Sequence, residues 1–369
     1  MKRLVVCFDG TWNSADSEEA ETNVTRLARA IHATQHRGDP QLVLYLRGVG
    51  STGIAAQKLI EGATGLGVDD NIRSGYMFLA QNYVPGDGIF LFGFSRGAFT
   101  ARSLAGFIGC CGLLKRQKLG DLTRAWKYYR EEVDRTPQGF CASCGSDTHM
   151  DVEITFLGVW DTVGALGVPT AILGAFTRDN YTFHDTSPSR IVKHGCHALA
   201  IDEHRDEFVP TLWTGQVPAV IRIEQVWFAG AHSDVGGGYA DRELADIPLV
   251  WMAGKASENG LAIDWSMLPD SNKLNPLAPR HDSRTGWSTK DMLTPTLRCV
   301  EGKPFQVAFY ERLYAPVDTQ GNLLPTINES VHESVRHRLG RNDLVTQGKE
   351  ETIVGRYEPR NLGHVKANQ

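Results

Sequence analysis

Short apolar runs alternate with amphipathic stretches along the first 250 residues or so. Apolar runs of strand length, bounded by Gly or polar residues, predict strands at 4–10, 42–48, 88–93, 153–161, 196–202 and 223–230. Helical spacing of apolar or small side chains predicts helices at 23–33, 71–83, 100–114, 121–133 and 243–254. Nearly continuous apolar strands separated by helices are typical of a parallel sheet covered on both faces. The pattern therefore predicts a doubly wound, mostly parallel α/β sheet with helices on both faces.

The alternation weakens from about residue 261, where Pro, Asn, Ser and Arg cluster. We predict a core domain over 1–260 and a C-terminal extension over 261–369 that packs on the core and has no catalytic motif of its own. Within the core, residues 165–176 are unusually apolar for a connection between strands. They fit a buried helix, and the alternative is a mobile lid over a binding site.

Composition and charge narrow the choice of partners. The chain has 43 acidic and 38 basic residues, for a formal net charge of −5, so it lacks the general positive charge that binds phosphate backbones. We expect no nucleic-acid partner. The N-terminal apolar run is interrupted at Asp9, and no other stretch has the length of a membrane-spanning helix, so we expect a soluble cytoplasmic protein. Seven scattered cysteines favour reduced thiols over a disulfide framework.

Polar or glycine-rich clusters follow five of the predicted strands. Because ligands bind beyond the carboxyl ends of the strands in open α/β sheets, we expect these clusters to lie at one edge. They are Asp9-Gly10-Thr11, Gly48-Val49-Gly50, Ser95, Asp161-Thr162 and His232-Ser233-Asp234. Residues 93–97, GFSRG, match G-x-S-x-G, in which a strand-to-helix turn presents a serine as nucleophile. The match follows a predicted strand and opens a predicted helix, which is the context that the motif requires.

A serine nucleophile needs a base, and the base needs an acid that orients it. We favour His232 among the twelve histidines, because it follows a predicted strand in a glycine-rich, solvent-accessible loop. Asp161 is the preferred acid, since a turn of small residues follows it. Asp202 is the alternative, in what we expect to be a solvated charged loop. Either aspartate gives the chain order Ser, Asp, His, which is the order of α/β-hydrolases, so we expect an α/β-hydrolase-like fold.

The tetrahedral intermediate of such a reaction needs N–H donors for its oxyanion. In this fold they come from the residue after the nucleophile and from an earlier strand-to-helix loop, which here means Arg96 and either Gly10 or Thr11. The Arg96 side chain could steer an anionic headgroup or could form a surface ion pair. The residues that we expect to shape the site are Asp9, Gly93, Gly97 and Asp234.

Three other interpretations compete with the serine triad. A metal-dependent phosphoesterase would use oxygen and nitrogen donors at the strand ends, namely Asp9, Asp161, His232 and Asp234. That interpretation leaves the serine motif without a role. A phosphatase-like FDGT segment has Cys7 where the reactive aspartate would stand, and Cys141 and Cys144 have only half of a zinc-site spacing, so we expect neither a metal nor a cofactor. The third interpretation is a non-catalytic scaffold that keeps the fold.

Five longer segments resemble a known protein family. They are FDGTWN (8–13), GFSRGAFTAR (93–102), GVWDTVGALG (158–167), HALAIDEHRDEFVPTLW (197–213) and VWFAGAHSDVGGGY (226–239). They are similar to the bacterial α/β-hydrolase family related to type VI secretion phospholipase effectors, long catalogued as a domain of unknown function. The resemblance extends over nearly the whole chain, with further similar segments at 332–339 and 356–362.

The resemblance implies a phospholipase-like esterase. In that family pattern Ser95 is the nucleophile, Asp161 the acid and His232 the base. The substrate would be a small-molecule or lipid ester. The sequence leaves open both contact with a membrane surface and delivery into another cell.

Overall fold

The computed structural model of the chain describes residues 1–10, 21–34, 38–48, 66–131, 135–164, 186–284, 293–318, 320–349 and 351–366. Three sequence predictions fall outside these residues: the apolar stretch 165–176, Thr11 as an oxyanion donor, and the cluster members Val49 and Gly50.

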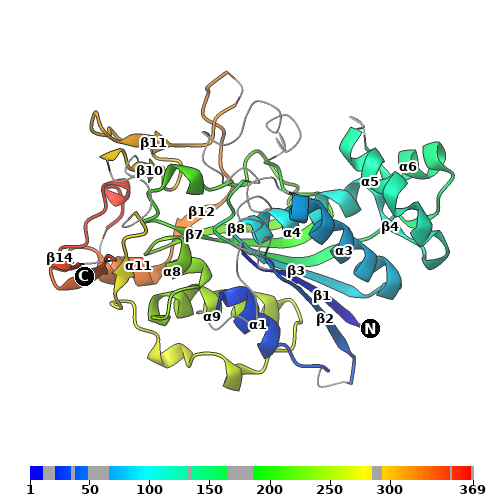
Figure 1. Cartoon of the computed structure of the whole chain (residues 1–369), viewed down its shortest axis with the longest axis horizontal. Helices are drawn as coiled ribbons and strands as arrows, with labels where there is room; N and C mark the ends of the chain where they lie inside the picture. The colour runs from blue at the N-terminus through cyan, green and yellow to red at the C-terminus, as the bar shows by residue number, and fades with distance from the viewer. Residues whose placement is uncertain are drawn as a thin grey trace.

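A seven-stranded sheet runs through the middle of the molecule in the order β12-β8-β7-β6-β3-β1-β2, and neighbouring strands in it are parallel (Figure 1). Its strands are β1 (Arg3–Phe8), β2 (Gln41–Leu46), β3 (Gly88–Phe94), β6 (Ile154–Trp160), β7 (Val192–Ala200), β8 (Arg222–Phe228) and β12 (Glu329–Val331). The predicted parallel α/β sheet is confirmed.

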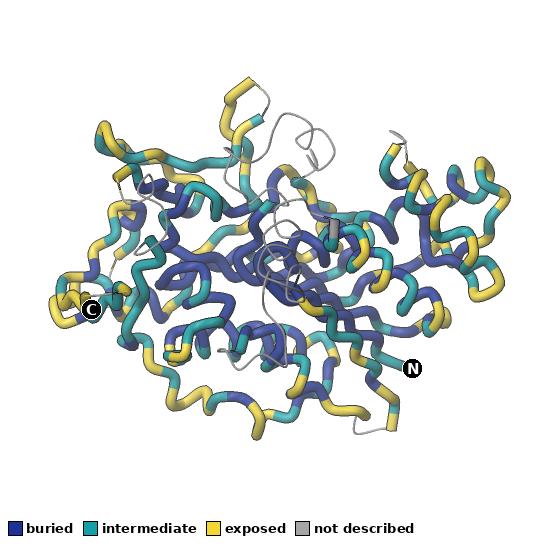
Figure 2. Tube along the Cα trace, in the orientation of Figure 1, coloured by how far each residue is buried: buried dark blue, intermediate teal, exposed yellow. Residues whose placement is uncertain are grey.

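Strand β1 explains why the apolar runs are nearly continuous. Alternate side chains of a strand point to opposite faces of its sheet. Leu4, Val6 and Phe8 pack into the hydrophobic cluster on one face, and Val5 and Cys7 pack into the cluster on the other. Both faces are buried, as the dark core of Figure 2 illustrates, so no polar position interrupts the run.

Helices cover both faces, as predicted. On one side lie α3 (Leu66–Asn82), α4 (Arg96–Cys111) and α5 (Leu122–Glu131), whose buried side chains share a cluster with Leu4 and Val6. On the other side α1 (Asn23–Ala30) and α9 (Glu243–Glu258) share a cluster with Val5 and Cys7. The doubly wound arrangement therefore follows from the apolar faces that the sequence indicates.

Some element bounds differ from the prediction. Strand β7 begins at Val192, four residues before the predicted start. The prediction began too late because Lys193 and His194 interrupt the apolar pattern, although His194 is buried. Helix α3 begins at Leu66, before the predicted residue 71. The segment with Cys141 and Cys144, for which the sequence predicted no element, is a helix, α6 (Pro137–Cys144). It lies near the short antiparallel pair β4 (Leu113–Leu114) and β5 (Thr148–His149).

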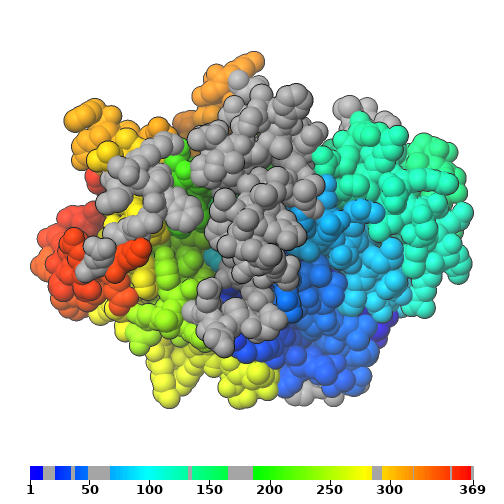
Figure 3. Space-filling model, viewed as in Figure 1, coloured from blue at the N-terminus to red at the C-terminus, as the bar shows by residue number. Residues whose placement is uncertain are grey.

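Residues after 260 first run beside α1 and then gather around the end of the sheet opposite α5 and α6 (Figure 3). They supply β12, which pairs with β8, and a third hydrophobic cluster in which Val331, Val335 and Tyr357 pack with Leu199 and Trp227. Their other elements are β9 (Arg280–His281), β10 (Thr296–Arg298), β11 (Arg312–Tyr314), α11 (Glu333–Arg338), β13 (Leu344–Gln347) and β14 (Thr352–Gly355). The division into two units at residue 260 stays a prediction.

The strand order reverses beside β1. The chain passes from β1 to β2 on one side and then returns to β3 on the other side. In open α/β sheets such a reversal separates the loops at the carboxyl ends of the two strands and leaves room for a ligand. The segments that follow β1 and β3 are Asp9-Gly10 and Ser95, so the topology directs attention to the serine motif.

Candidate active site

Ser95 lies at a sharp turn between β3 and α4. Its backbone has φ 58° and ψ −123°, a conformation that a residue with a side chain adopts only under strain. The backbone N–H of Ser95 donates to the carbonyl oxygen of Trp160, at 3.1 Å, and so ties the turn to the end of β6. This is the strand-turn-helix context that the G-x-S-x-G motif predicts.

The two glycines of the motif permit the close packing of this turn. A Cβ atom on Gly97 would lie 2.2 Å from the carbonyl oxygen of Phe8, and one on Gly93 would lie 2.3 Å from the carbonyl oxygen of Gly97. Real Cβ atoms do not approach backbone oxygens so closely. Glycine at both positions lets the first turn of α4 pack directly against the end of β1.

Asp161 and His232 are brought together from the ends of β6 and β8. His232 begins the short helix α8 (His232–Gly236), and its Nδ1 lies 2.6 Å from Oδ2 of Asp161. Asp161, like Ser95, has a positive φ, 35°, and these two are among four non-glycine residues with positive φ in the described part of the chain. Half of the strained positions therefore fall on residues that the sequence analysis selected.

His232 is enclosed by aromatic rings. The ring centroid of Phe94, the residue before Ser95, lies 4.5 Å from that of the imidazole, and the ring of Phe208 meets it edge-on at 4.8 Å. Only 4% of His232 is exposed. The expectation of a solvent-accessible loop is therefore wrong: α8 forms here, and burial lowers the pKa of His232, with Asp161 acting in the opposite direction.

Four N–H groups surround the Asp161 carboxylate. Oδ1 accepts from the backbone N–H of Ala200 at 3.0 Å and from Arg298 Nη1 at 2.7 Å, and Oδ2 accepts from Arg298 Nη2 at 3.0 Å and from His232 Nδ1. Burial alone would raise the pKa of Asp161, but the charge of Arg298 and the bond from His232 lower it below its ordinary value. The carboxylate is therefore ionised, and because it cannot donate, the proton of the shared bond belongs to His232 Nδ1.

Sequence reasoning did not find Arg298. It lies in the extension, which we expected to have no catalytic motif, 137 residues after Asp161. No local pattern distinguishes a buried arginine from an exposed one before the fold is known. The same holds for Phe208, since the three residues before it are charged.

The alternative acid, Asp202, lies in a buried cluster and not in a solvated loop. Its Oδ2 accepts from the backbone N–H of Gly230 and from the Tyr357 hydroxyl, and its Oδ1 accepts from Arg280. The neighbouring Glu203 is also buried and forms a two-bond ion pair with Arg205, which lowers its pKa to about 2 against the effect of burial. The bonds of Asp202 to Arg280 and Tyr357 connect the core to the extension. The carboxylate that contacts His232 Nδ1 is that of Asp161.

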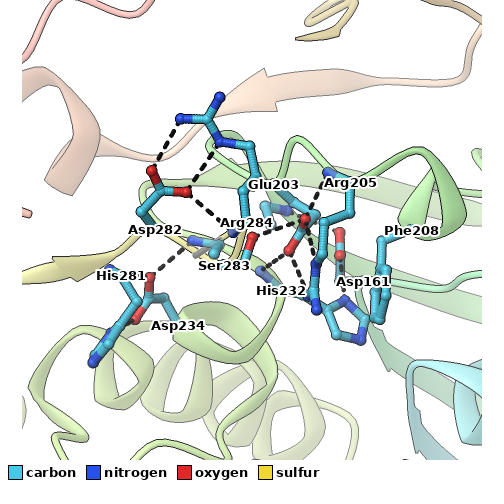
Figure 4. Close-up of polar contacts among 12 residues, drawn as sticks. Asp161, Glu203, Arg205, Phe208, His232, Asp234, His281, Asp282, Ser283 and Arg284 are labelled. Atoms are coloured by element: carbon cyan, nitrogen blue, oxygen red, sulfur yellow. Dashed lines mark hydrogen bonds and ion pairs between the residues drawn. The ribbon is translucent and has the colours of Figure 1, made fainter. Parts of the chain in front are cut away.

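Asp234 forms a second aspartate–histidine pair close to the first. Its Oδ1 lies 2.6 Å from His281 Nδ1, and its Oδ2 accepts from the backbone N–H groups of Ala231 and His281. Figure 4 shows the two pairs on either side of Glu203. Sequence reasoning placed Asp234 at the site but missed its partner His281, which comes from β9.

Asp9 directly follows the carboxyl end of β1, and its carboxylate accepts four hydrogen bonds. The donors are the backbone N–H of Gly10 and the hydroxyls of Thr22, Thr25 and Tyr45, at 2.5–2.8 Å. Burial raises the pKa of Asp9, and these bonds oppose the rise. Because Gly10 already donates to Asp9, its N–H would have to change partner to bind an oxyanion.

Arg96 is buried, with 8% of its surface exposed, and burial lowers its pKa to about 10. Arg96 therefore does not lie on the surface, as the ion-pair interpretation assumed. Its backbone N–H belongs to the first turn of α4, whose N–H groups have no acceptor within the helix. The positive end of the helix dipole also favours a negative charge at this position.

The four donors of the metal interpretation do not form one cluster. Asp161 is bound by Arg298, Asp9 by hydroxyl groups and Asp234 by His281. Among the described residues, three metal-ligating side chains gather at His194, Cys196 and Glu224, at the other end of β7. There Lys255 and Arg222 bind Glu224, so its negative charge is already compensated. In the part of the chain that the structure describes, no helix is long and apolar enough to cross a membrane.

Comparison with known proteins gives a family and three relatives. A family model described as "T6SS, Phospholipase effector Tle1-like, catalytic domain" matches residues 2–255. The uncharacterized protein YEL023C of Saccharomyces cerevisiae is 32% identical over 239 residues, 58% of this chain and 33% of the relative, so this chain spans about a third of that protein's length.

Two solved structures are also similar. One is an uncharacterized protein from Pseudomonas aeruginosa, with a TM-score of 0.40 and 18% identity, covering 73% of this chain and 48% of that one. The other is the Tle1 effector bound to the VgrG spike of the type VI secretion system, with a TM-score of 0.39 and 21% identity, covering 65% of this chain and 51% of that one.

Proposed function

The chain belongs to the family of Tle1-like phospholipase effector catalytic domains, and we propose that it is a serine hydrolase that cleaves a carboxylic ester of a lipid. In this proposal Ser95 is the nucleophile, His232 the base and Asp161 the acid. One observation carries it: the 2.6 Å contact between Asp161 and His232 lies beside the strained turn that holds Ser95. The family description supports the lipid class of the substrate.

The first half of the proposed reaction forms an acyl-enzyme. His232 Nε2 takes the proton of Ser95 as Oγ attacks the acyl carbon, and the carbonyl electrons move to its oxygen. The intermediate then collapses, the bond to the alcohol breaks, and His232 returns the proton to the departing alcohol oxygen. Asp161 stabilises the imidazolium while it carries that proton.

The second half releases the acid. His232 takes a proton from water as the water oxygen attacks the acyl carbon, and Ser95 Oγ leaves with that proton. In both halves we place the oxyanion at the N-terminus of α4, within reach of the backbone N–H of Arg96. The Arg96 side chain, as a cation buried beside the nucleophile, is our candidate for steering an anionic headgroup.

Location and delivery are part of the same proposal. The family is described by its type VI secretion effectors, so we propose that the enzyme is delivered into another cell and acts at a lipid surface.

The test compares Ser95→Ala with Ser103→Ala, a buried serine of α4, the helix that follows Ser95. We expect Ser95→Ala to lose ester hydrolysis and labelling by a fluorophosphonate probe, and Ser103→Ala to keep both. Turnover that survives in Ser95→Ala would contradict the triad. A wild-type chain that neither hydrolyses lipid vesicles or soluble esters nor reacts with the probe would favour the scaffold interpretation, and activity that a chelator removes and a divalent ion restores would favour the metal one.

A further inference from the structure

The most deeply buried cation beside the site comes from the extension. Arg298 ends β10, is 1% exposed, and directs its guanidinium at the Asp161 carboxylate. Its Nη1 binds Oδ1 of Asp161 and its Nη2 binds Oδ2, the two-bond geometry that fixes a carboxylate in orientation as well as in charge.

The same guanidinium also binds two backbone oxygens. Nη1 donates to the carbonyl of Ala200 at 2.7 Å, and Nη2 donates to the carbonyl of Phe208 at 2.6 Å. Arg298 thereby connects the carboxylate to the end of β7 and to the segment whose phenyl ring packs on His232. Arg298 therefore positions both Asp161 and the segment with Phe208, whose ring packs on His232.

Strand β10, which carries Arg298, is bound to neighbouring segments by several hydrogen bonds. The backbone N–H of Thr296 donates to the carbonyl of His204, the Thr296 hydroxyl binds Asp206, and β10 pairs with β11. His204 and Asp206, which lie shortly before Phe208, are therefore attached to the strand that carries Arg298. This arrangement begins beyond residue 255, where the family match ends.

We infer that Arg298 is a positioning residue of the proposed triad: it holds the Asp161 carboxylate by both oxygens, so that Oδ2 meets His232 Nδ1 in one orientation. The inference rests on the proposed function, and it adds that the extension completes the active site. Among the described residues, Arg298 forms its hydrogen bonds with Asp161, Ala200 and Phe208. It acts through Asp161.

The charge of Arg298 has a second consequence for the pair. A buried carboxylate without a cation binds a proton more readily, and an uncompensated carboxylate also stabilises an imidazolium beside it. Either effect makes the Asp161–His232 pair take up a proton at a higher pH when Arg298 is lost. The other charged or titratable groups around the pair are His197 in β7, Glu203 and Arg205 after β7, and Asp234 in α8.

The experiment compares Arg298→Met, Arg298→Lys and a control, Arg338→Met. Arg338 is also buried and also comes from the extension, but it binds the carbonyls of Pro276 and Ala278 and not the triad. For ester hydrolysis we expect Arg298→Met to lower kcat by about 10- to 100-fold with KM little changed, the usual cost of losing the partner that orients a functional side chain. Lysine, with one point of contact, should restore part of the loss.

The pH profile gives the readout that a purely structural role would not move. We expect the acidic limb of kcat/KM to shift to higher pH in Arg298→Met and to stay in place in Arg338→Met. If the acidic limb of Arg298→Met stayed at the wild-type pH, or if the limb of Arg338→Met shifted equally, the inference would be overturned. If Arg298→Met does not fold, Asp161→Asn combined with Arg298→Met removes both charges, and its activity should equal that of Asp161→Asn alone.

An NMR titration of His232 separates the two proposals, because it requires no activity. A higher protonation midpoint of His232 in Arg298→Met supports the inference even if the wild type hydrolyses no ester, and in that case the proposed function alone fails. Hydrolysis that depends on Ser95, together with an unchanged midpoint and unchanged kcat in Arg298→Met, would overturn the inference and leave the proposed function standing.

Discussion

Two aspartate–histidine pairs lie side by side in this molecule with the same 2.6 Å contact, yet their surroundings differ. In the first, Asp161 is held by Arg298 and His232 is enclosed by Phe94 and Phe208. In the second, Asp234 accepts backbone N–H groups of α8 and β9, and His281 stacks on Tyr239. The contact itself therefore does not identify a catalytic base.

The difference lies in what each pair can do with a proton. The pKa of Asp161 is lowered by Arg298 against burial, whereas the pKa of Asp234 is raised by burial against its hydrogen bonds. His232 lies beside the serine turn, while His281 joins two backbone segments. We interpret the first pair as catalytic and the second as a structural link that holds the N-terminus of α8, and so His232, in place.

The largest expected difference between the two pairs comes from replacing each histidine. We expect His232→Gln to lower kcat by roughly 10⁶-fold, as loss of the base does in a serine triad, and His281→Gln to keep kcat within about tenfold of the wild type. Steady-state ester hydrolysis measures both. Similar losses in the two variants would contradict the assignment of roles.

The aspartates form the next contrast. Asp161→Asn keeps the shape of the side chain but removes the charge that holds the Nδ1–H tautomer, so we expect a loss of about 10⁴-fold in kcat. Asp234→Asn should change kcat far less. If both variants were equally inactive while still folded by circular dichroism, Asp234 would belong to the catalytic machinery.

A pH profile sharpens the contrast without mutation. His232 accepts a proton only when neutral, and burial lowers its pKa, so activity should persist below pH 6.5, the ordinary imidazole value, and fall at lower pH as the imidazole is protonated. Asp161 stays ionised across this window because its pKa is lowered. If the acidic limb of kcat/KM lay above pH 6.5, the pKa of His232 would not be lowered in the active enzyme.

The smallest effect should be on stability. Asp234→Asn places an amide where the carboxylate accepts two backbone N–H groups and His281, so we expect a loss of about 1–3 kcal/mol in the free energy of unfolding. His281→Gln removes one of these bonds and should cost about 1 kcal/mol. Urea unfolding measures both. Wild-type stability in Asp234→Asn would show that the second pair does not hold α8.

The serine turn could be predicted because its cause is local. Gly93 and Gly97 are required where backbone passes within contact distance of backbone, and the apolar run before them forms a strand in any parallel sheet. The sequence indicated Asp161 and His232 for a related reason: each follows a strand, and parallel strands end at one edge. The mistakes concerned surroundings, since the expected open loop at His232 is a buried helix and the charged segment after β7 is buried.

What the sequence alone determined is the alternating α/β sheet, the turn at Ser95 and the edge at which the candidate residues gather, because strand periodicity, glycine and chain order are properties of neighbouring residues. Only the tertiary structure decided which carboxylate meets His232, that Arg298 compensates it, and that His281 binds Asp234. Those contacts join segments up to 137 residues apart. Their energy depends on burial and on charge at close range, and neither exists until the chain has folded.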